Sequence, residues 1–192
     1  MTNRRLFLAG AAATLWAAPA FAGARFKPLF DGQSLAGWTP VGNANWTVTD
    51  GAIGADSGGM SFLVSRDAYR DFELRAEFWV SEDANSGIFI RCSDRTAITA
   101  DNAYECNIFD TRPDPSYGTG SIVNVAKVSP MPKAGGRWNA MEIAARGDRF
   151  SITLNGKKTV DDARDGKHEA GPIALQYGAG IVKFRKVEIR VM

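Results

Sequence analysis

The sequence NSGIFIRCSDRTAITADNAYECNIFD, residues 85–110, is the stretch around which the predicted fold is organised. Two of its segments, 87–92 and 103–109, have the side-chain alternation that is typical of β-strands, and a polar loop joins them. We expect these segments to form an antiparallel pair, because strands so close along a chain pair readily in that sense.

The two faces of this predicted pair carry different side chains. Successive side chains of a strand point to opposite faces, so Glu105 and Asn107 share one face and Cys106 lies on the other. If the pairing brings Cys92 near Cys106, the apolar side chains meet on one side. Arg91 then joins Glu105 and Asn107 on the other side, and we expect the chemistry of the protein there.

Short strand patterns recur along the rest of the chain. The clearest is 72–80, where apolar side chains alternate with charged ones and with Trp79. Asp50-Gly51 and Asn155-Gly156 follow alternating segments and indicate hairpin turns. Roughly a dozen short strands, few helical periods and no internal repeat predict an all-β sandwich or jelly roll rather than a propeller or a solenoid.

The first residues have the pattern of an export signal. Arg4 and Arg5 precede an apolar run that ends in Ala20-Phe21-Ala22, as in a cleavable signal of the twin-arginine type. The alternative is an amphipathic or membrane-anchoring helix, although the run is short for a bilayer span. We therefore expect residues 1–22 to be removed, 23–192 to form one domain, and the protein to be periplasmic or secreted.

The charge balance of the expected mature chain is neutral. Of the 23 Lys and Arg residues, Arg4 and Arg5 lie in the signal segment, which leaves 21 against 21 Asp and Glu. Such a balance lacks the excess of positive charge that favours binding to nucleic acid or to an anionic membrane surface. We therefore expect neither partner after signal cleavage.

The two cysteines leave two states open. In an exported chain, Cys92 and Cys106 either form one disulfide or remain buried free thiols. His168 is the only histidine, and its charged surroundings predict that it is solvated. The sequence therefore shows neither a zinc-ligand spacing nor a catalytic Cys–His pair.

Short motifs follow one another in a fixed order along most of the chain. Among them are PLFDG (28–32), DFEL (71–74), NSGIFIR (85–91), LNG (154–156) and GPIALQ (171–176). Together they resemble the 3-keto-disaccharide hydrolase family. The resemblance implies a concanavalin A-like jelly-roll sandwich of two curved antiparallel sheets, with a carbohydrate site on the concave face. It also implies an exported protein that acts on sugars oxidised at C3.

The chemistry of that family depends on the ketone at C3. The ketone acidifies the proton on C2, so a positioned base can remove it while the glycosidic oxygen leaves, and water can then add to give net hydrolysis. This route needs a carboxylate base and a cation or metal ion for the developing enolate oxygen. The resemblance therefore allows a divalent metal ion as cofactor, although it assigns no ligands to one.

Three residues are predicted to be catalytic. Glu105 is the expected base, and a structural ion pair with Arg91 is its alternative role. Arg91 matches the NSGIFIR motif and is expected to clamp sugar or enolate oxygens. Asp110 is expected to position substrate if its strand ends or bulges there; its alternative role is to cap the loop 111–120.

Five further residues are predicted to bind substrate. Asn107 shares the face of Glu105, Asn85 precedes the strand, and Gln176 ends the motif GPIALQ. Trp79 and Tyr177 are aromatic side chains that could stack on a sugar ring. Family members commonly carry a histidine before the glycine that follows this motif, whereas this chain reads Leu175-Gln176-Tyr177-Gly178.

The sequence as a whole predicts a carbohydrate-active protein. The first hypothesis is an exported hydrolase or lyase that cleaves 3-keto-glycosides by abstraction of the C2 proton. The alternative is a lectin-like jelly-roll module that binds carbohydrate without turnover. A third hypothesis, an inert structural or partner-binding sandwich, is favoured if the face of Glu105 is filled by the protein's own side chains.

Overall fold

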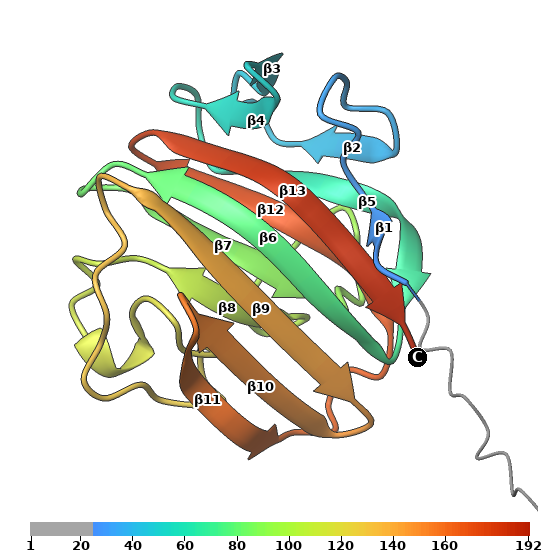
Figure 1. The fold of residues 1–192 in the computed structure, drawn as a ribbon, viewed down its shortest axis with the longest axis vertical. Coiled ribbons are helices and arrows are strands. Elements are labelled where there is room, and N and C mark those ends of the chain that lie inside the picture. The colour runs from blue at the N-terminus through green and yellow to red at the C-terminus, as the bar shows by residue number, and fades with distance from the viewer. Residues whose placement is uncertain (1–24) are drawn as a thin grey trace, which may run out of the picture.

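The computed structural model describes residues 25–192 and places thirteen β-strands in two antiparallel sheets that pack face to face (Figure 1). The predicted signal segment, residues 1–22, lies outside the described residues. No helix within 25–192 is long and apolar enough to cross a membrane. The all-β sandwich predicted from the strand spacing is confirmed.

The larger sheet has eight strands. In spatial order it contains β11 (Lys157–Arg164), β10 (Arg149–Leu154), β9 (Trp138–Arg146), β6 (Phe72–Val80), β13 (Val182–Val191), β4 (Ala52–Ala55) and β3 (Thr47–Thr49), with β1 (Lys27–Pro28) also pairing with β13. The smaller sheet contains β2 (Trp38–Val41), β5 (Ser61–Tyr69), β12 (Gly171–Ala179), β7 (Asn85–Ile90) and β8 (Tyr104–Ile108). The predicted pair of strands within 85–110 is therefore the pair β7–β8, at one edge of the smaller sheet.

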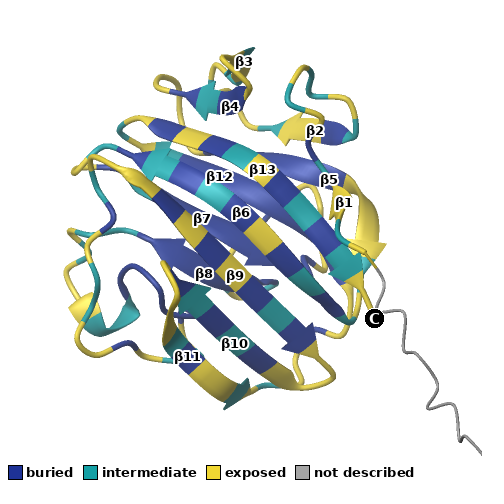
Figure 2. Cartoon of the chain, viewed as in Figure 1, coloured by how far each residue is buried: buried dark blue, intermediate teal, exposed yellow. Residues whose placement is uncertain are grey.

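The main hydrophobic core lies between the two sheets. Phe72, Leu74 and Phe78 of β6 are fully buried in it, while Glu73, Arg75, Glu77 and Trp79 of that strand lie toward solvent, as their alternation predicted. Figure 2 shows the same alternation of buried and exposed residues along β9 and β13. A half-buried antiparallel sheet explains this pattern.

The five-stranded sheet differs because both of its faces are largely buried. One face, with Ile88 and Cys106, packs into the core between the sheets. The opposite face, which we call the outer face, carries a second apolar cluster that includes Phe62 and Phe89. The loop that follows β7 contributes Ile98 to this cluster. Strands β7, β8 and β12 are therefore buried along nearly their whole length.

The chain beyond β8 covers the edge of the smaller sheet. The amide of Asn107 donates to the carbonyl oxygen of Ser121 over 3.1 Å, and the amide of Val123 donates to that of Glu105 over 3.0 Å. A short 3-10 helix, η1 (Pro115–Tyr117), lies within the same loop. These bonds fix the backbone of Glu105 and Asn107 on the side of β8 that faces away from β7.

The register of β7 and β8 decides between the two states left open for the cysteines. Cys106 pairs with Ile88, so the pairing that would bring Cys92 near Cys106 is wrong. Cys106 lies in the core between the sheets, whereas Cys92 lies in the cluster on the outer face. Both thiols are free and buried.

Candidate functional site

Strand register places several polar residues in two neighbouring rows on the outer face. In the first row, Gly87 of β7 lies between Gln176 of β12 and Asn107 of β8. In the second row, Phe89 lies beside Glu105. Residues two apart on a strand share a face, so the two rows belong to one surface. Three adjacent strands thus bring an acid and two amides together.

The side chains of the two rows converge over Gly87. The point that a Cβ on Gly87 would occupy is 3.2 Å from Gln176 Oε1 and 3.5 Å from Glu105 Cγ. The carboxyl-bearing side chain and the amide therefore both lie close above the glycine. A glycine inside a strand often marks a place where a ligand or another backbone approaches closely.

Glu105 has an unusual electrostatic environment. Its side chain is 8% exposed, and no residue in the described part of the chain forms an ion pair or a hydrogen bond with its carboxylate. Burial raises the pKa of Glu105 to about 7, and the positive charge of Arg112 opposes that rise. A carboxyl with this pKa exchanges a proton near neutral pH, as a general base must.

The two amides of the first row have unpaired oxygens. Asn107 is 0% exposed and its Nδ2 donates to the carbonyl oxygen of Tyr117 over 2.6 Å, but its Oδ1 has no partner. Gln176 is 4% exposed and its Oε1 also has no partner. No other buried side-chain nitrogen or oxygen within residues 25–192 lacks a hydrogen bond. Leaving such an atom unpaired costs about 1–3 kcal/mol, so the two unpaired oxygens lower the stability of the folded protein.

Asn85 and two aromatic residues complete the surroundings of the site. Asn85 lies two residues before Gly87 on β7, next to Gly178, where an added Cβ would be 2.9 Å from Asn85 Nδ2. Phe62 and Phe89 form an edge-to-face pair, with ring centroids 5.2 Å apart, beside the two rows. Alternation along 87–92 places Phe89 on the face of Glu105, and that signal could have identified it; no comparable signal marks Phe62.

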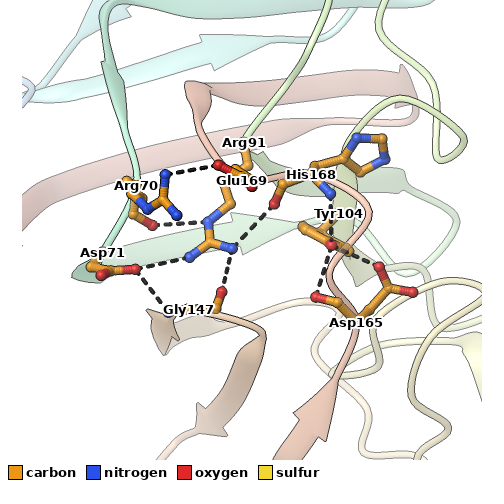
Figure 3. A network of polar contacts seen from close by, with 8 residues as sticks. All are labelled: Arg70, Asp71, Arg91, Tyr104, Gly147, Asp165, His168 and Glu169. Carbon is orange, nitrogen blue, oxygen red and sulfur yellow. Dashed lines mark hydrogen bonds and ion pairs between the residues drawn. The ribbon is translucent and has the colours of Figure 1, made fainter.

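Arg91 does not join this group, and the predicted pairing with Glu105 is wrong. Strand β7 ends at Ile90, and Arg91 has a positive φ of 53°, so the alternation stops and the side chain turns to the core side. Its guanidinium donates to the carbonyl oxygens of Arg70, Gly147 and His168 over 2.7–3.1 Å and pairs with Asp71 at 3.2 Å (Figure 3). Arg91 is 1% exposed and ties the two sheets together at one end.

His168 belongs to the same network and is not solvated as predicted. Its backbone amide donates to the hydroxyl of Tyr104 over 3.0 Å, and that hydroxyl donates to Asp165 Oδ1 over 2.7 Å (Figure 3). The imidazole packs edge-on against the ring of Tyr104 and is 9% exposed. Burial lowers the pKa of His168, which favours the neutral ring.

The hydrogen bonds of Asp110 agree with its alternative role, which is to cap the loop 111–120. Its Oδ1 accepts a hydrogen bond from Thr119 Oγ1 over 2.6 Å. Its Oδ2 accepts from the backbone amides of Ala134 and Gly135 over 2.8 and 2.9 Å. Both carboxylate oxygens are thus occupied in joining two loops, and this arrangement does not support the predicted catalytic role.

The two aromatic residues predicted to stack on sugar lie elsewhere. Tyr177 follows Gln176 directly, so alternation turns it into the core, where its ring packs edge-on against Trp46. Trp79 lies on the solvent side of the eight-stranded sheet, with Lys183 Nζ 5.5 Å from its ring centroid. Neither residue reaches the outer face of the smaller sheet, because each belongs to a different surface of the sandwich.

Glu105 has a cation nearby, whereas a group of metal-ion ligands is not found within residues 25–192. Within residues 25–192, no three His, Cys, Asp or Glu side chains are grouped so that they could hold a metal ion, and we assign no metal ligands. Arg112, in the loop after β8, is the cation whose charge acts on Glu105. Sequence reasoning missed it, because the loop 111–120 has no periodicity that relates its side chains to the strands.

Several proteins that are similar to this chain have names that refer to carbohydrates. A 3-keto-disaccharide hydrolase of Bacteroides thetaiotaomicron is 27% identical over 60% of this chain, which spans about half the length of that relative. A candidate glycosyl hydrolase of Parabacteroides distasonis has a similar crystal structure, with a TM-score of 0.71, 26% identity and coverage of 88% of this chain and 100% of that one.

The carbohydrate-binding module CBM66 of Bacillus subtilis shares the fold, with a TM-score of 0.65, 24% identity and coverage of 80% of this chain and 95% of the module. The predicted jelly-roll sandwich is thereby confirmed. Residues 25–190 match the family model described as the 3-keto-alpha-glucoside-1,2-lyase-like domain. Since this match covers most of the sequence, the chain belongs to the 3-keto-alpha-glucoside-1,2-lyase-like family, the 3-keto-disaccharide hydrolases that its motifs resemble.

Proposed function

We propose that this protein cleaves 3-keto-glycosides by removing the proton on C2, with Glu105 as the base. One observation carries the proposal: Glu105 is a buried carboxyl without a protein partner, its pKa is raised to about 7, and it lies beside two amides with unpaired oxygens. Structural acids are normally paired, so a buried unpaired acid indicates a functional site. Family membership supplies the class of substrate.

The proposed reaction is an elimination. Glu105 takes the C2 proton, the electrons of the C2–H bond form a C1–C2 double bond, and the bond from C1 to the glycosidic oxygen breaks. The departing oxygen takes a proton from the protonated Glu105 or from solvent. Addition of water across the new double bond then gives the products of hydrolysis.

The raised pKa suits Glu105 to this task. A carboxylate with a pKa of about 7 is a stronger base than an ordinary glutamate and is still ionised above neutral pH. Negative charge develops on the C3 oxygen as the proton leaves. We assign the stabilisation of that charge to Arg112, the cation whose field acts on Glu105, in place of Arg91.

Incubation of the purified protein with a 3-keto-disaccharide, with and without a divalent metal ion, tests the proposal. The wild type is expected to release the monosaccharides or the unsaturated keto-sugar, and Glu105→Gln is expected to lose at least about a hundredfold in rate. Glu142→Gln is the matched control, because Glu142 is exposed on the other sheet and pairs only loosely with Arg75. Absence of product from the wild type, or full activity of Glu105→Gln, contradicts the proposal.

The second candidate function is carbohydrate binding without turnover. The similarity in fold to a carbohydrate-binding module favours it, as do the unpaired amide oxygens, which need only a hydroxyl-bearing ligand. Isothermal titration with oligosaccharides separates the two functions. Binding that persists in Glu105→Gln, without product from the wild type, supports the binding module.

A further inference from the structure

We infer that the row Gln176–Gly87–Asn107 is a subsite that recognises two hydroxyl groups of an uncharged sugar, and that Gly87 allows the side chains of Gln176 and Glu105 to lie close together there. This inference rests on the proposed function in one respect, namely that the ligand is a sugar. It adds the polarity of the groups that are recognised and the residue that lets their acceptor take its place.

The amide of Asn107 fixes the polarity of the subsite. Its Nδ2 donates to the carbonyl oxygen of Tyr117, and a carbonyl oxygen can only accept. The amide therefore has one orientation, and the unpaired atom is the acceptor Oδ1. A ligand that pairs with Oδ1 must bring a donor, such as a hydroxyl hydrogen.

Gln176 provides the second acceptor. Its Oε1 is buried without a partner and lies 3.2 Å from the point above Gly87 where a Cβ would be. Two acceptors beside the carboxyl of Glu105 disfavour a carboxylate or a sulfate at this place, because such groups present only acceptors and carry negative charge. Neutral sugars, which present hydroxyl hydrogens, are the class of ligand that fits.

Gly87 lies beneath the side chains of Gln176 and Glu105. Gln176 and Asn107 lie on the strands either side of it, and neighbouring strands are about 4.8 Å apart. The backbone of Gly87 has no positive φ, so its conformation does not require glycine. What a Cβ would meet is the Gln176 oxygen at 3.2 Å and the carbonyl oxygen of Cys106 at 3.3 Å. We therefore attribute the glycine to the close approach of the Gln176 side chain and of the Cys106 carbonyl group, which a methyl group would displace.

Gly54 is a matched control for Gly87. It also lies inside a strand, β4, and has no positive φ. A Cβ there would make only ordinary contacts, with the nearest atoms at 3.6 and 3.8 Å. Gly54→Ala adds the same methyl group to the other sheet and is expected to leave ligand binding unchanged.

The test uses methyl α-D-glucopyranoside, its 3-keto derivative and its monodeoxyfluoro analogues, with binding measured by ligand-observed NMR. Fluorine is close to a hydroxyl in size but cannot donate a hydrogen bond. Fluorination at two ring positions is expected to weaken binding about tenfold or more each, because it leaves a buried acceptor unpaired. Gln176→Leu is expected to abolish the discrimination at one of these two positions. Gly87→Ala is expected to weaken binding of all the probes about tenfold or more.

Three results would overturn the inference: no detectable binding of either glucoside, an effect below about threefold for fluorine at every position, or equal affinity for methyl α-D-glucuronide. Turnover of a 3-keto-disaccharide, measured in parallel, separates this inference from the proposed function. Turnover without discrimination refutes the subsite alone. Discrimination without turnover refutes the catalytic proposal and leaves the subsite standing.

Discussion

Arg91, which follows strand β7 of the smaller sheet, donates through Nη1 to the carbonyl oxygen of Gly147, in the turn between β9 and β10 of the larger sheet, over 2.7 Å. Its guanidinium carbon also lies 5.0 Å from the ring centroid of Phe150. The two sheets are thus joined at one end by a buried cation. The NSGIFIR motif therefore contributes to the site through Gly87 and to the stability of the sandwich through Arg91.

Replacement of Arg91 by Met is expected to destabilise the protein by about 1–3 kcal/mol for each carbonyl oxygen that loses its buried donor. The variant leaves the carbonyl oxygens of Gly147 and His168 without this donor and Asp71 without its cation. Urea unfolding measures the change. Arg75→Met, at an exposed arginine on the larger sheet, is the control and should change stability by less than about 1 kcal/mol. A stable Arg91→Met that has lost only activity would restore the catalytic role that the structure does not support.

Glu105 is expected to make both activity and stability depend on pH around neutrality. As a base it must be ionised, so the rate should rise as the pH rises through about 7 and level off above it. The pH–rate profile of the wild type with a 3-keto-disaccharide measures this. A rate that is flat between pH 5 and 8 would contradict the role of Glu105 as base.

The effect of Glu105 on stability has the opposite sign. The pKa of Glu105 is about 7 in the folded protein, against an ordinary value of 4.5, so between these values the folded state binds more protons than the unfolded state. Stability from this group therefore falls as the pH rises from about 4.5 to 7, by up to about 3 kcal/mol. Glu105→Gln removes the effect, so it should be more stable than the wild type at pH 8 and close to it at pH 4. Urea unfolding at both pH values measures the difference.

The sequence predicts the placement of the site wherever strand alternation continues. Glu105 and Asn107 lie within β8, and the structure brings them to one face together with Gln176 of β12. Tyr177 follows Gln176 within the same strand, so the same alternation predicts that its side chain lies in the core. The hypothesis that Tyr177 stacks on a sugar disregards this alternation.

The placement of Arg91 could not be derived in this way. Alternation requires that a strand continues, and β7 ends one residue before Arg91, which has the positive φ that non-glycine residues seldom adopt. The role of Asp110 depends likewise on two loops, since its partners lie 9 to 25 residues further along the chain. Contacts of this kind between loops leave no periodic signal in a sequence.

Asp110→Asn is expected to lower stability by about 1–3 kcal/mol while leaving the rate per folded molecule unchanged. An amide in place of the carboxylate turns one of the two accepting oxygens into a donor, which leaves either Thr119 or the amides of Ala134 and Gly135 without an acceptor. Thermal unfolding and turnover of a 3-keto-disaccharide are measured on the same samples. Asp114→Asn, which affects only the cap of η1, is the control. A lower rate at unchanged stability would instead support the predicted catalytic role of Asp110.

Cys92 and Cys106 are expected to stay reduced in the folded protein even under oxidising conditions. They lie on opposite faces of the smaller sheet, so the geometry of a disulfide is out of reach without unfolding. Burial also raises the pKa of both thiols, to about 12 for Cys92, which suppresses the reactive thiolate. A thiol reagent should therefore modify both residues in denaturant and neither in native buffer, and intact mass after mild oxidation should show no loss of two hydrogens. Mapping of a Cys92–Cys106 disulfide in protein oxidised under native conditions would show that the β7–β8 register is wrong.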